Sequence, residues 1–75
     1  MYDPKLNEKW IVDLSPTRGD ELGGIRKCLV EQKISENLYR IIPYCYSFSF
    51  EGVEEEPMYD HARTVDISRF KQRSV

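Results

Sequence analysis

Two apolar segments that flank a long charged loop constrain this chain more than any other feature of its sequence. Residues 9–14 read KWIVDL and place Trp10, Val12 and Leu14 on one face, which is the two-residue period of a β-strand. Residues 25–31 form a second segment of this kind. A Ser-Pro pair ends the first segment, because proline lacks the amide donor that a sheet needs. The region therefore predicts two strands joined by a loop.

The loop between these strands is rich in glycine and in charge. Gly19, Gly23 and Gly24 permit backbone angles that other residues resist, while Arg18 and Asp20 favour contact with water. Ordering a long loop costs more conformational entropy than ordering a two-residue hairpin turn. We therefore expect it to carry function.

Two stretches carry a resemblance to a known family. Residues 12–26, VDLSPTRGDELGGIR, resemble the signature of the MazF/PemK family of toxin endoribonucleases, in which a strand ending V-D-L-(S/D)-P is followed by T-x-G-x-E-x-G-G-x-R. Residues 60–69, DHARTVDISR, are similar to a later segment of that family, (D/E)-Q-(I/V)-R-T-(V/I)-D-x-x-R-L. The two stretches stand in the order that the family shows.

The pattern of short strand-like segments with little helical periodicity predicts an all-β fold. A small SH3-like barrel would remove unpaired sheet edges, and the alternative is a strongly bent antiparallel sheet. Seventy-five residues allow one domain, so we expect residues 1–75 to form a single MazF/PemK-like domain that lacks the family's C-terminal helix. The predicted core consists of Trp10, Val12, Leu14, Leu29, Ile42 and Val65.

Residues 38–50 form the longest strand-like stretch, and Pro43 is expected to split or kink it. After the proline, aromatic residues alternate with small polar ones. This aromatic face is expected to be core, the alternative being a platform on which RNA bases stack. Its members are Tyr44, Tyr46, Phe48 and Phe50.

The rest of the chain offers weaker signals. Residues 51–57 read as an acidic turn, and residues 58–67 as a last strand. Asp66 or Ser68 would then cap a short final turn over residues 69–73.

The family resemblance implies metal-independent cleavage of single-stranded RNA, which needs a base, an acid and positive charge against the phosphorane. Arg26 has a planar, permanently charged donor fork that fits phosphate oxygens. The resemblance also implies a Thr or Ser that works with this arginine, for which the nearest counterparts are Cys45 and Ser47. In the structural alternative, Arg26 pins the loop by pairing with Asp13, Asp20 or Glu21.

Substrate contacts are expected around Arg26. Arg18 and Lys27 are neighbouring positive groups that could hold phosphates. His61 has the one side chain with an unperturbed pKa near neutrality, so it either exchanges protons or serves as a surface hydrogen-bonding group. Glu21 either positions the loop or acts as a base. The predicted substrate-binding residues are Thr17, Arg18, Glu21, Lys27 and His61.

Charge and cysteine content restrict the partners. The net charge is −2, with 11 basic and 13 acidic residues, so an RNA site requires a local basic patch. Cys28 and Cys45 are too few and too far apart for a metal signature, so no metal or cofactor is expected and both thiols are predicted to be buried. The sequence has no signal-peptide pattern and no membrane-spanning stretch, which predicts a cytoplasmic protein with no membrane partner.

Two functional hypotheses follow. The first is a MazF/PemK-like toxin of a toxin–antitoxin system, homodimeric, cutting single-stranded RNA and neutralised by an antitoxin segment. The second is a catalytically inactive SH3-like module that binds protein or nucleic acid. The glycine loop and Arg26 favour the first hypothesis. Lys27, at a position where the family has proline, and the short span between the two stretches favour the second.

Overall fold

The computed structural model describes residues 3–15 and 23–74 of the chain. These residues form antiparallel strands and two short 3-10 turns, and no α-helix occurs within them. None of this described part is a helix that could span a membrane. The elements are β1 (Lys9–Asp13), β2 (Ile25–Lys33), β3 (Leu38–Ser49), β4 (Gly52–Pro57), η1 (Tyr59–His61), β5 (Arg63–Asp66), η2 (Ile67–Arg69) and β6 (Phe70–Ser74).

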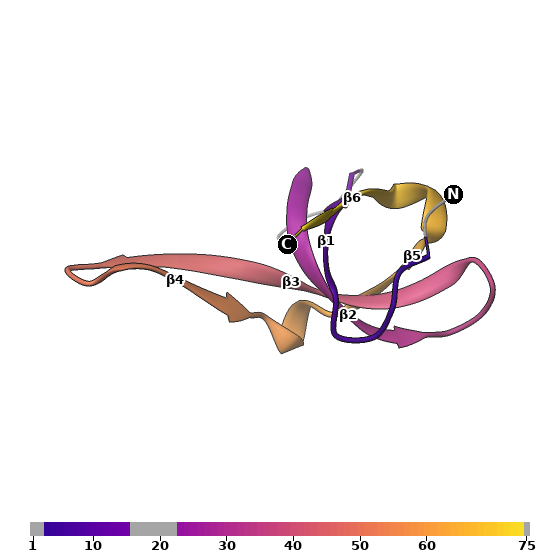
Figure 1. Ribbon diagram of the computed structural model, residues 1–75, viewed down its shortest axis with the longest axis horizontal. Coiled ribbons are helices and arrows are strands. Elements are labelled where there is room, and N and C mark those ends of the chain that lie inside the picture. The colour runs from indigo at the N-terminus through magenta and orange to yellow at the C-terminus, as the bar shows by residue number, and fades with distance from the viewer. Residues whose placement is uncertain (1–2, 16–22, 75) are drawn as a thin grey trace.

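All six strands belong to one antiparallel sheet, with the order β4-β3-β2-β1-β6 and with β5 paired to β3. Over the described residues the sheet stays open, because its path ends at β4 on one side and at β6 on the other. Figure 1 shows β2 bending sharply in its middle, where it crosses β3. The all-β prediction is confirmed, in the form of a bent sheet rather than a closed barrel.

The core lies on the concave face of the bent sheet, where alternate residues of five strands meet. Phe70 is at its centre, edge-on to the rings of Trp10 and Tyr39 at centroid distances of 5.6 and 5.4 Å. Such edge-to-face contacts add to the burial energy of aromatic side chains. The buried cluster is formed by Trp10, Val12, Leu14, Cys28, Val30, Tyr39, Ile41, Val65 and Phe70.

Four of the six predicted core residues belong to this cluster. The other two, Leu29 and Ile42, face each other across the β2–β3 ladder on the opposite side of the sheet. Ile42 is buried there and Leu29 is partly exposed. Successive residues of a strand point to opposite faces, so Leu29 cannot share a face with its neighbours Cys28 and Val30.

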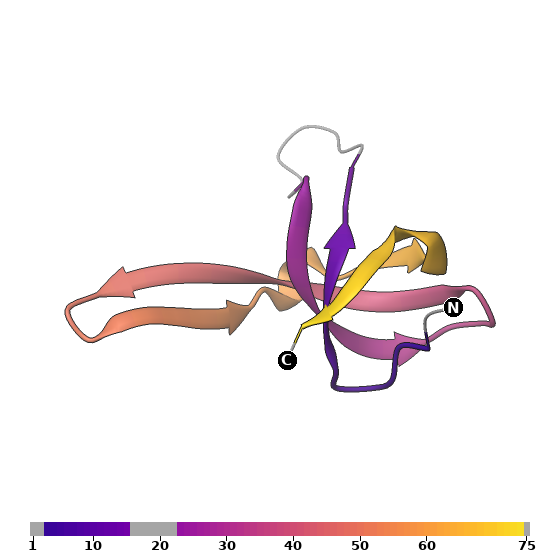
Figure 2. The ribbon, with the colours of Figure 1, turned by 45° about the horizontal axis from the view of Figure 1, so that its top comes forward.

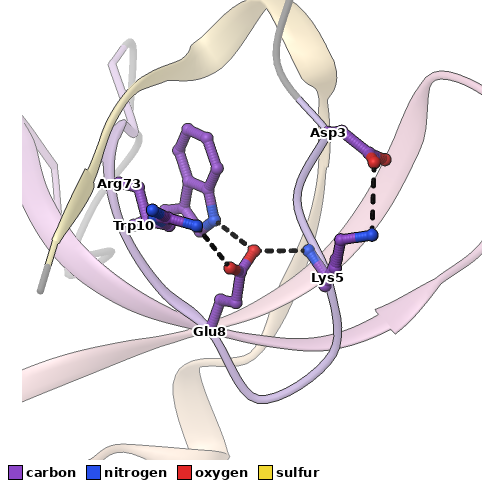
Figure 3. Close-up of polar contacts among 5 residues, drawn as sticks. All are labelled: Asp3, Lys5, Glu8, Trp10 and Arg73. Atoms are coloured by element: carbon purple, nitrogen blue, oxygen red, sulfur yellow. Dashed lines mark hydrogen bonds and ion pairs between the residues drawn. The ribbon is translucent and has the colours of Figure 1, made fainter.

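The N-terminal segment is fastened to both β1 and β6 by one carboxylate (Figure 3). Glu8 accepts hydrogen bonds from the Lys5 amide at 2.8 Å and from the Trp10 indole nitrogen at 3.2 Å. Its second oxygen lies 3.3 Å from Nη1 of Arg73 in β6. These contacts tie the edge strand β6 to the start of β1.

Strand β3 belongs to two parts of the molecule. Its first half pairs with β2 on one edge and with β5 on the other. From Tyr44 onward its partner is β4, and the two form a hairpin that extends away from the other strands (Figure 1). We call residues 44–57 the arm and the remaining sheet the body. The molecule measures 42 Å along the arm's direction and 19 Å across its shortest dimension.

Pro43 does not split β3 into two strands, which was one of the two outcomes expected there. The strand runs through it, and the pairing changes there from β2 to β4. The missing amide donor of proline is tolerated because the β2 ladder ends at the Cys28–Pro43 pair. The carbonyl of Pro43 still accepts a hydrogen bond from the Met58 amide at 2.8 Å.

The predicted acidic turn over residues 51–57 is instead strand β4. The turn is confined to the tip, where Gly52 has φ +124°, a backbone angle that favours glycine. The aromatic face of β3 was expected to be core, but only Tyr44 is buried, at 6% exposure. Tyr46, Phe48 and Phe50 are exposed because the arm carries them beyond the body.

The segment after the arm also differs from the single strand expected over residues 58–67. It forms η1 and then β5, and Asp66 accepts a hydrogen bond from the Ser68 amide at 2.8 Å. Of the two predicted capping residues, Asp66 and Ser68, it is Asp66 that caps the turn. The capped turn is η2, and the residues expected to form the final turn lie mostly in strand β6.

Candidate nucleic-acid interface

The neck of the glycine loop is closed by hydrogen bonds between its two ends. The Leu14 amide donates to the Gly24 carbonyl at 2.9 Å, and the Gly24 amide donates to the Ser15 hydroxyl oxygen at 3.2 Å. Gly24 has φ +76°, so a side chain there would strain the backbone. The Asp13 carboxylate accepts from the Ser15 amide at 2.9 Å. The ends of the loop are therefore fixed relative to β1 and β2.

Arg26 lies directly after this neck, as the second residue of β2. Its side chain is partly buried on the concave face, and Nε donates to the Gly23 carbonyl at 3.0 Å. The bond holds the plane of the guanidinium in place. The other donors of the fork have no hydrogen bond to a residue of the described ranges, which leaves them suited to an anionic ligand.

Arg63, the first residue of β5, reaches the same neck from the other end of the sequence. Its Nη1 lies 3.4 Å from the Leu14 carbonyl oxygen. Arg63 pairs with Ile41 in the β3–β5 ladder and shares the concave face with Val65. The two resembling stretches therefore each supply one arginine to the neck of the loop.

The charges of Arg26 and Arg63 both act on the pKa of the Cys28 thiol. Burial raises the pKa of Cys28 to about 12, while the positive charges of Arg26 and Arg63 both act to lower it. Both guanidiniums are thus close enough to the same buried atom to affect its ionisation. The high pKa keeps the thiol protonated at neutral pH, so Cys28 is neither a nucleophile nor a base there.

Lys27 lies on the opposite face of β2 from Arg26. Its ammonium bonds both carboxylate oxygens of Glu55 in the arm, at 2.9 and 3.1 Å. This hydrogen bond to Glu55 is the first cause of a raised Lys27 pKa. Lys27 therefore contacts the arm, and its side chain lies on the other face of the sheet from Arg26.

Cys45 and Ser47 are also separated from Arg26. Both are exposed residues of the arm, paired across the hairpin with Glu56 and Glu54. The β2–β3 ladder ends before them, and Figure 2 shows β2 and the second half of β3 running in different directions. The exposure of Cys45 also corrects the prediction that both cysteines are buried, which holds for Cys28 alone.

His61 ends the turn η1, which connects the arm to β5. Its Nε2 lies 3.8 Å from a carboxylate oxygen of Asp60, and its side chain is 32% exposed. It stands two positions before Arg63 in the chain. The other predicted substrate-binding residues, Thr17, Arg18 and Glu21, lie outside the described residues.

Arg63 was not among the site residues predicted from sequence. The available signal was its position in the second resembling stretch, where it fills the arginine of R-T-V-D. Only the β3–β5 pairing shows that it faces the glycine loop. Asp13, named as a structural partner of Arg26, instead bonds Ser15, and this bond is the main cause of its lowered pKa, with Lys71 and Arg69 as minor contributors.

The candidate interface is thus two arginines at the neck of a glycine loop, above a protonated thiol. Within residues 3–15 and 23–74, no three His, Cys, Asp or Glu side chains gather closely enough to hold a metal ion. No model of a known protein family matches this sequence, and no curated protein matches it either.

Proposed function

We propose that this protein binds single-stranded RNA through a backbone phosphate held between Arg26 and Arg63, as a MazF/PemK-like endoribonuclease would. The convergence of these two arginines at the neck of the glycine loop carries the proposal. Each arginine comes from one of the two stretches that resemble the family. Guanidinium groups bind phosphate oxygens through paired, charge-assisted hydrogen bonds.

The contacts of the two arginines suit this task. Each guanidinium is positioned by a backbone carbonyl, at Gly23 and at Leu14, so less side-chain entropy is lost when a phosphate binds. Both side chains are partly buried, which strengthens their interaction with an anion relative to a fully hydrated site. The two guanidiniums would supply, at this one place, positive charge that a chain of net charge −2 lacks overall.

Cleavage needs a proton acceptor for the 2′-hydroxyl as well as positive charge. The arginines would stabilise the phosphorane, and the Cys28 thiol, with a pKa of about 12, does not supply the base. We assign that role for testing to His61, which precedes Arg63 by two positions. As a toxin, the protein would also have an antitoxin segment as its partner.

The test uses labelled single-stranded RNA in EDTA, with binding followed by fluorescence anisotropy and cleavage by gel. Arg26→Ala and Arg63→Ala should each weaken binding by about tenfold or more, since a hydrogen bond to a charged group contributes roughly 1.5–3 kcal/mol. Lys27→Ala is the matched control, because it removes one positive charge from the other face of β2. It should bind within about threefold of wild type.

Melting temperatures separate the site from a structural role. If Arg26→Ala and Arg63→Ala unfold early, or bind RNA as wild type does, the two arginines only fasten the loop and the proposal fails. His61→Gln should abolish cleavage and leave binding intact.

The location of Cys45 and Ser47 on the arm favours a second candidate, an RNA-binding module of the same lineage that does not cut. In that case binding would depend on both arginines, as above, but no product would form at any pH.

A further inference from the structure

The arm has two chemically different faces. Residues paired across an antiparallel ladder share a face, so Tyr46, Phe48 and Val53 lie on one side of the arm. Cys45, Ser47, Ser49, Glu54 and Glu56 lie on the other side. We call these the aromatic face and the acidic face. The aromatic face continues from buried Tyr44, and its exposure increases from Tyr46, beside the body, to Phe48 farther along the arm.

The aromatic face is close to electrically neutral. Its one carboxylate is Glu55, opposite Tyr46, and this group bonds Lys27 at 2.9 Å and lies 3.8 Å from the Lys9 ammonium. Glu54 and Glu56 point away on the acidic face. Two copies can therefore stack their aromatic faces without bringing unpaired carboxylates together, whereas their acidic faces would repel.

The charge of the arm argues against RNA as the occupant. Residues 44–57 contain four glutamates and no lysine or arginine. A surface on which RNA bases stack also needs positive groups along the phosphate backbone. The exposed aromatic residues are therefore better suited to contact an apolar protein surface than a polyanion such as RNA.

The apolar area exposed on the arm is large enough for a small, weak dimer interface. Tyr46 is 43% exposed, Phe48 82%, Val53 58%, and Phe50 in the adjoining turn 110%. With about 150–200 Å² for each fully exposed large side chain, this amounts to roughly 440–590 Å² per copy. Two copies would bury about 900–1,200 Å², at the lower end for specific interfaces.

We infer that the aromatic face of the arm is an interface with a second copy of this chain, forming a two-fold symmetric dimer. The same patch serves both copies, as a two-fold axis requires. A two-stranded ribbon with an uncovered apolar face is marginal in water, so pairing also stabilises the arm. The interface is separate from Arg26 and Arg63, and so its test is independent of RNA binding.

Sedimentation equilibrium tests this from about 1 to 200 μM, the range that brackets a micromolar dissociation constant. The wild-type chain should pass from monomer to dimer over this range. Phe48→Lys places a charge on the aromatic face and should remain monomeric. Ser47→Lys, the matched control, introduces the same side chain one position away on the acidic face and should still dimerise.

Both positions are exposed, and unchanged circular dichroism spectra should show that both variants keep their fold. Benzoylphenylalanine placed at position 48 should cross-link to residues 44–57 of another copy, which mixing of isotope-labelled and unlabelled chains identifies. A wild-type monomer throughout the range would overturn the inference. So would equal dissociation of the two lysine variants, or cross-links to the body or to a different protein instead of the arm.

Discussion

The ammonium of Lys27 in β2 hydrogen-bonds both carboxylate oxygens of Glu55 in β4, at 2.9 and 3.1 Å. The two residues are 28 positions apart, and their side chains are 16% and 32% exposed. Lys9 adds a second ammonium 3.8 Å from the same carboxylate, and it also lies 5.4 Å from the centre of the Tyr44 ring. This cluster fastens the base of the arm to the body.

We expect Lys27 and Glu55 to be energetically coupled. A double-mutant cycle with Lys27→Met and Glu55→Gln, measured by urea unfolding, should give a coupling of about 0.5–1 kcal/mol, the upper range for partly exposed ion pairs. Glu54→Gln is the control, since Glu54 lies on the acidic face of the arm. A coupling of Lys27 to Glu54 as large as that to Glu55 would contradict the assigned register.

Glu8 should make the protein less stable in acid. Its pKa is lowered, first by the hydrogen bond from the Lys5 amide and then by that from Trp10, with Arg73 contributing less. The ionised carboxylate therefore stabilises the fold above its ordinary pKa of 4.5, and this contribution is lost as the pH falls through the lowered folded-state value. Melting curves of Glu8→Gln should depend less on pH than wild type between about pH 5 and 2.

Glu36→Gln provides the comparison for this pH series, since it removes an exposed carboxylate from the connection between β2 and β3. It should keep the wild-type pH dependence. Identical curves for Glu8→Gln and wild type would mean that the contacts drawn in Figure 3 do not contribute to acid stability. Some slope should persist in Glu8→Gln, because the pKa values of Asp13 and Asp66 are also lowered, each by hydrogen bonds first.

The two thiols should differ sharply in reactivity. Cys45 is exposed, whereas Cys28 is buried and burial raises its pKa to about 12. With a disulfide reagent at about pH 8, one thiol should react at once and the other only after denaturant is added. Cys45→Ser should remove the fast reaction and Cys28→Ser the slow one. Two equally fast thiols would show that the concave face is open to the reagent.

Phe70 should be the most costly aromatic residue to truncate. It is 1% exposed and contacts both Trp10 and Tyr39, so Phe70→Ala should destabilise by about 3–5 kcal/mol. In a domain this small that loss is enough to unfold the chain, and Phe70→Leu should keep the fold at a lower melting temperature. Urea unfolding followed by Trp10 fluorescence measures both.

The same truncation on the arm is the matched control for Phe70. Phe48 is 82% exposed, so Phe48→Ala should change the free energy of unfolding by less than about 0.5 kcal/mol, measured at a low protein concentration. Comparable losses at the two positions would mean that Phe48 is packed in the folded chain.

The sequence correctly predicted the buried residues of strands in which apolar and polar residues alternate and the apolar side faces the core. Trp10, Val12 and Leu14 lie in the core as their spacing indicated, and Val65 joins them from β5. Tyr46 and Phe48 alternate as regularly, yet they are exposed. Their burial depends on whether another layer covers the strand, which is a property of the tertiary fold and not of the strand itself.

Strand β4 was missed for a related reason. Its three consecutive glutamates have the composition of a solvated turn, and they form a strand only because β3 offers them a free edge. Only part of the candidate site was predicted, because the rest also depends on how the strands pair. Arg26 stands beside the glycine loop in the sequence, but Arg63 reaches the neck only through the β3–β5 pairing.

The way the arm joins the body has a consequence for how its length can vary. The chain leaves at Tyr44 and returns at Pro57, which face each other across the hairpin. Removing one residue from each strand would shorten the hairpin but exchange the faces of everything beyond the cut, whereas removing two from each would preserve them. Such a segment can lengthen or contract in steps of four residues while the body keeps its packing. Such a change would alter how far the arm extends and leave the fold of the body as it is.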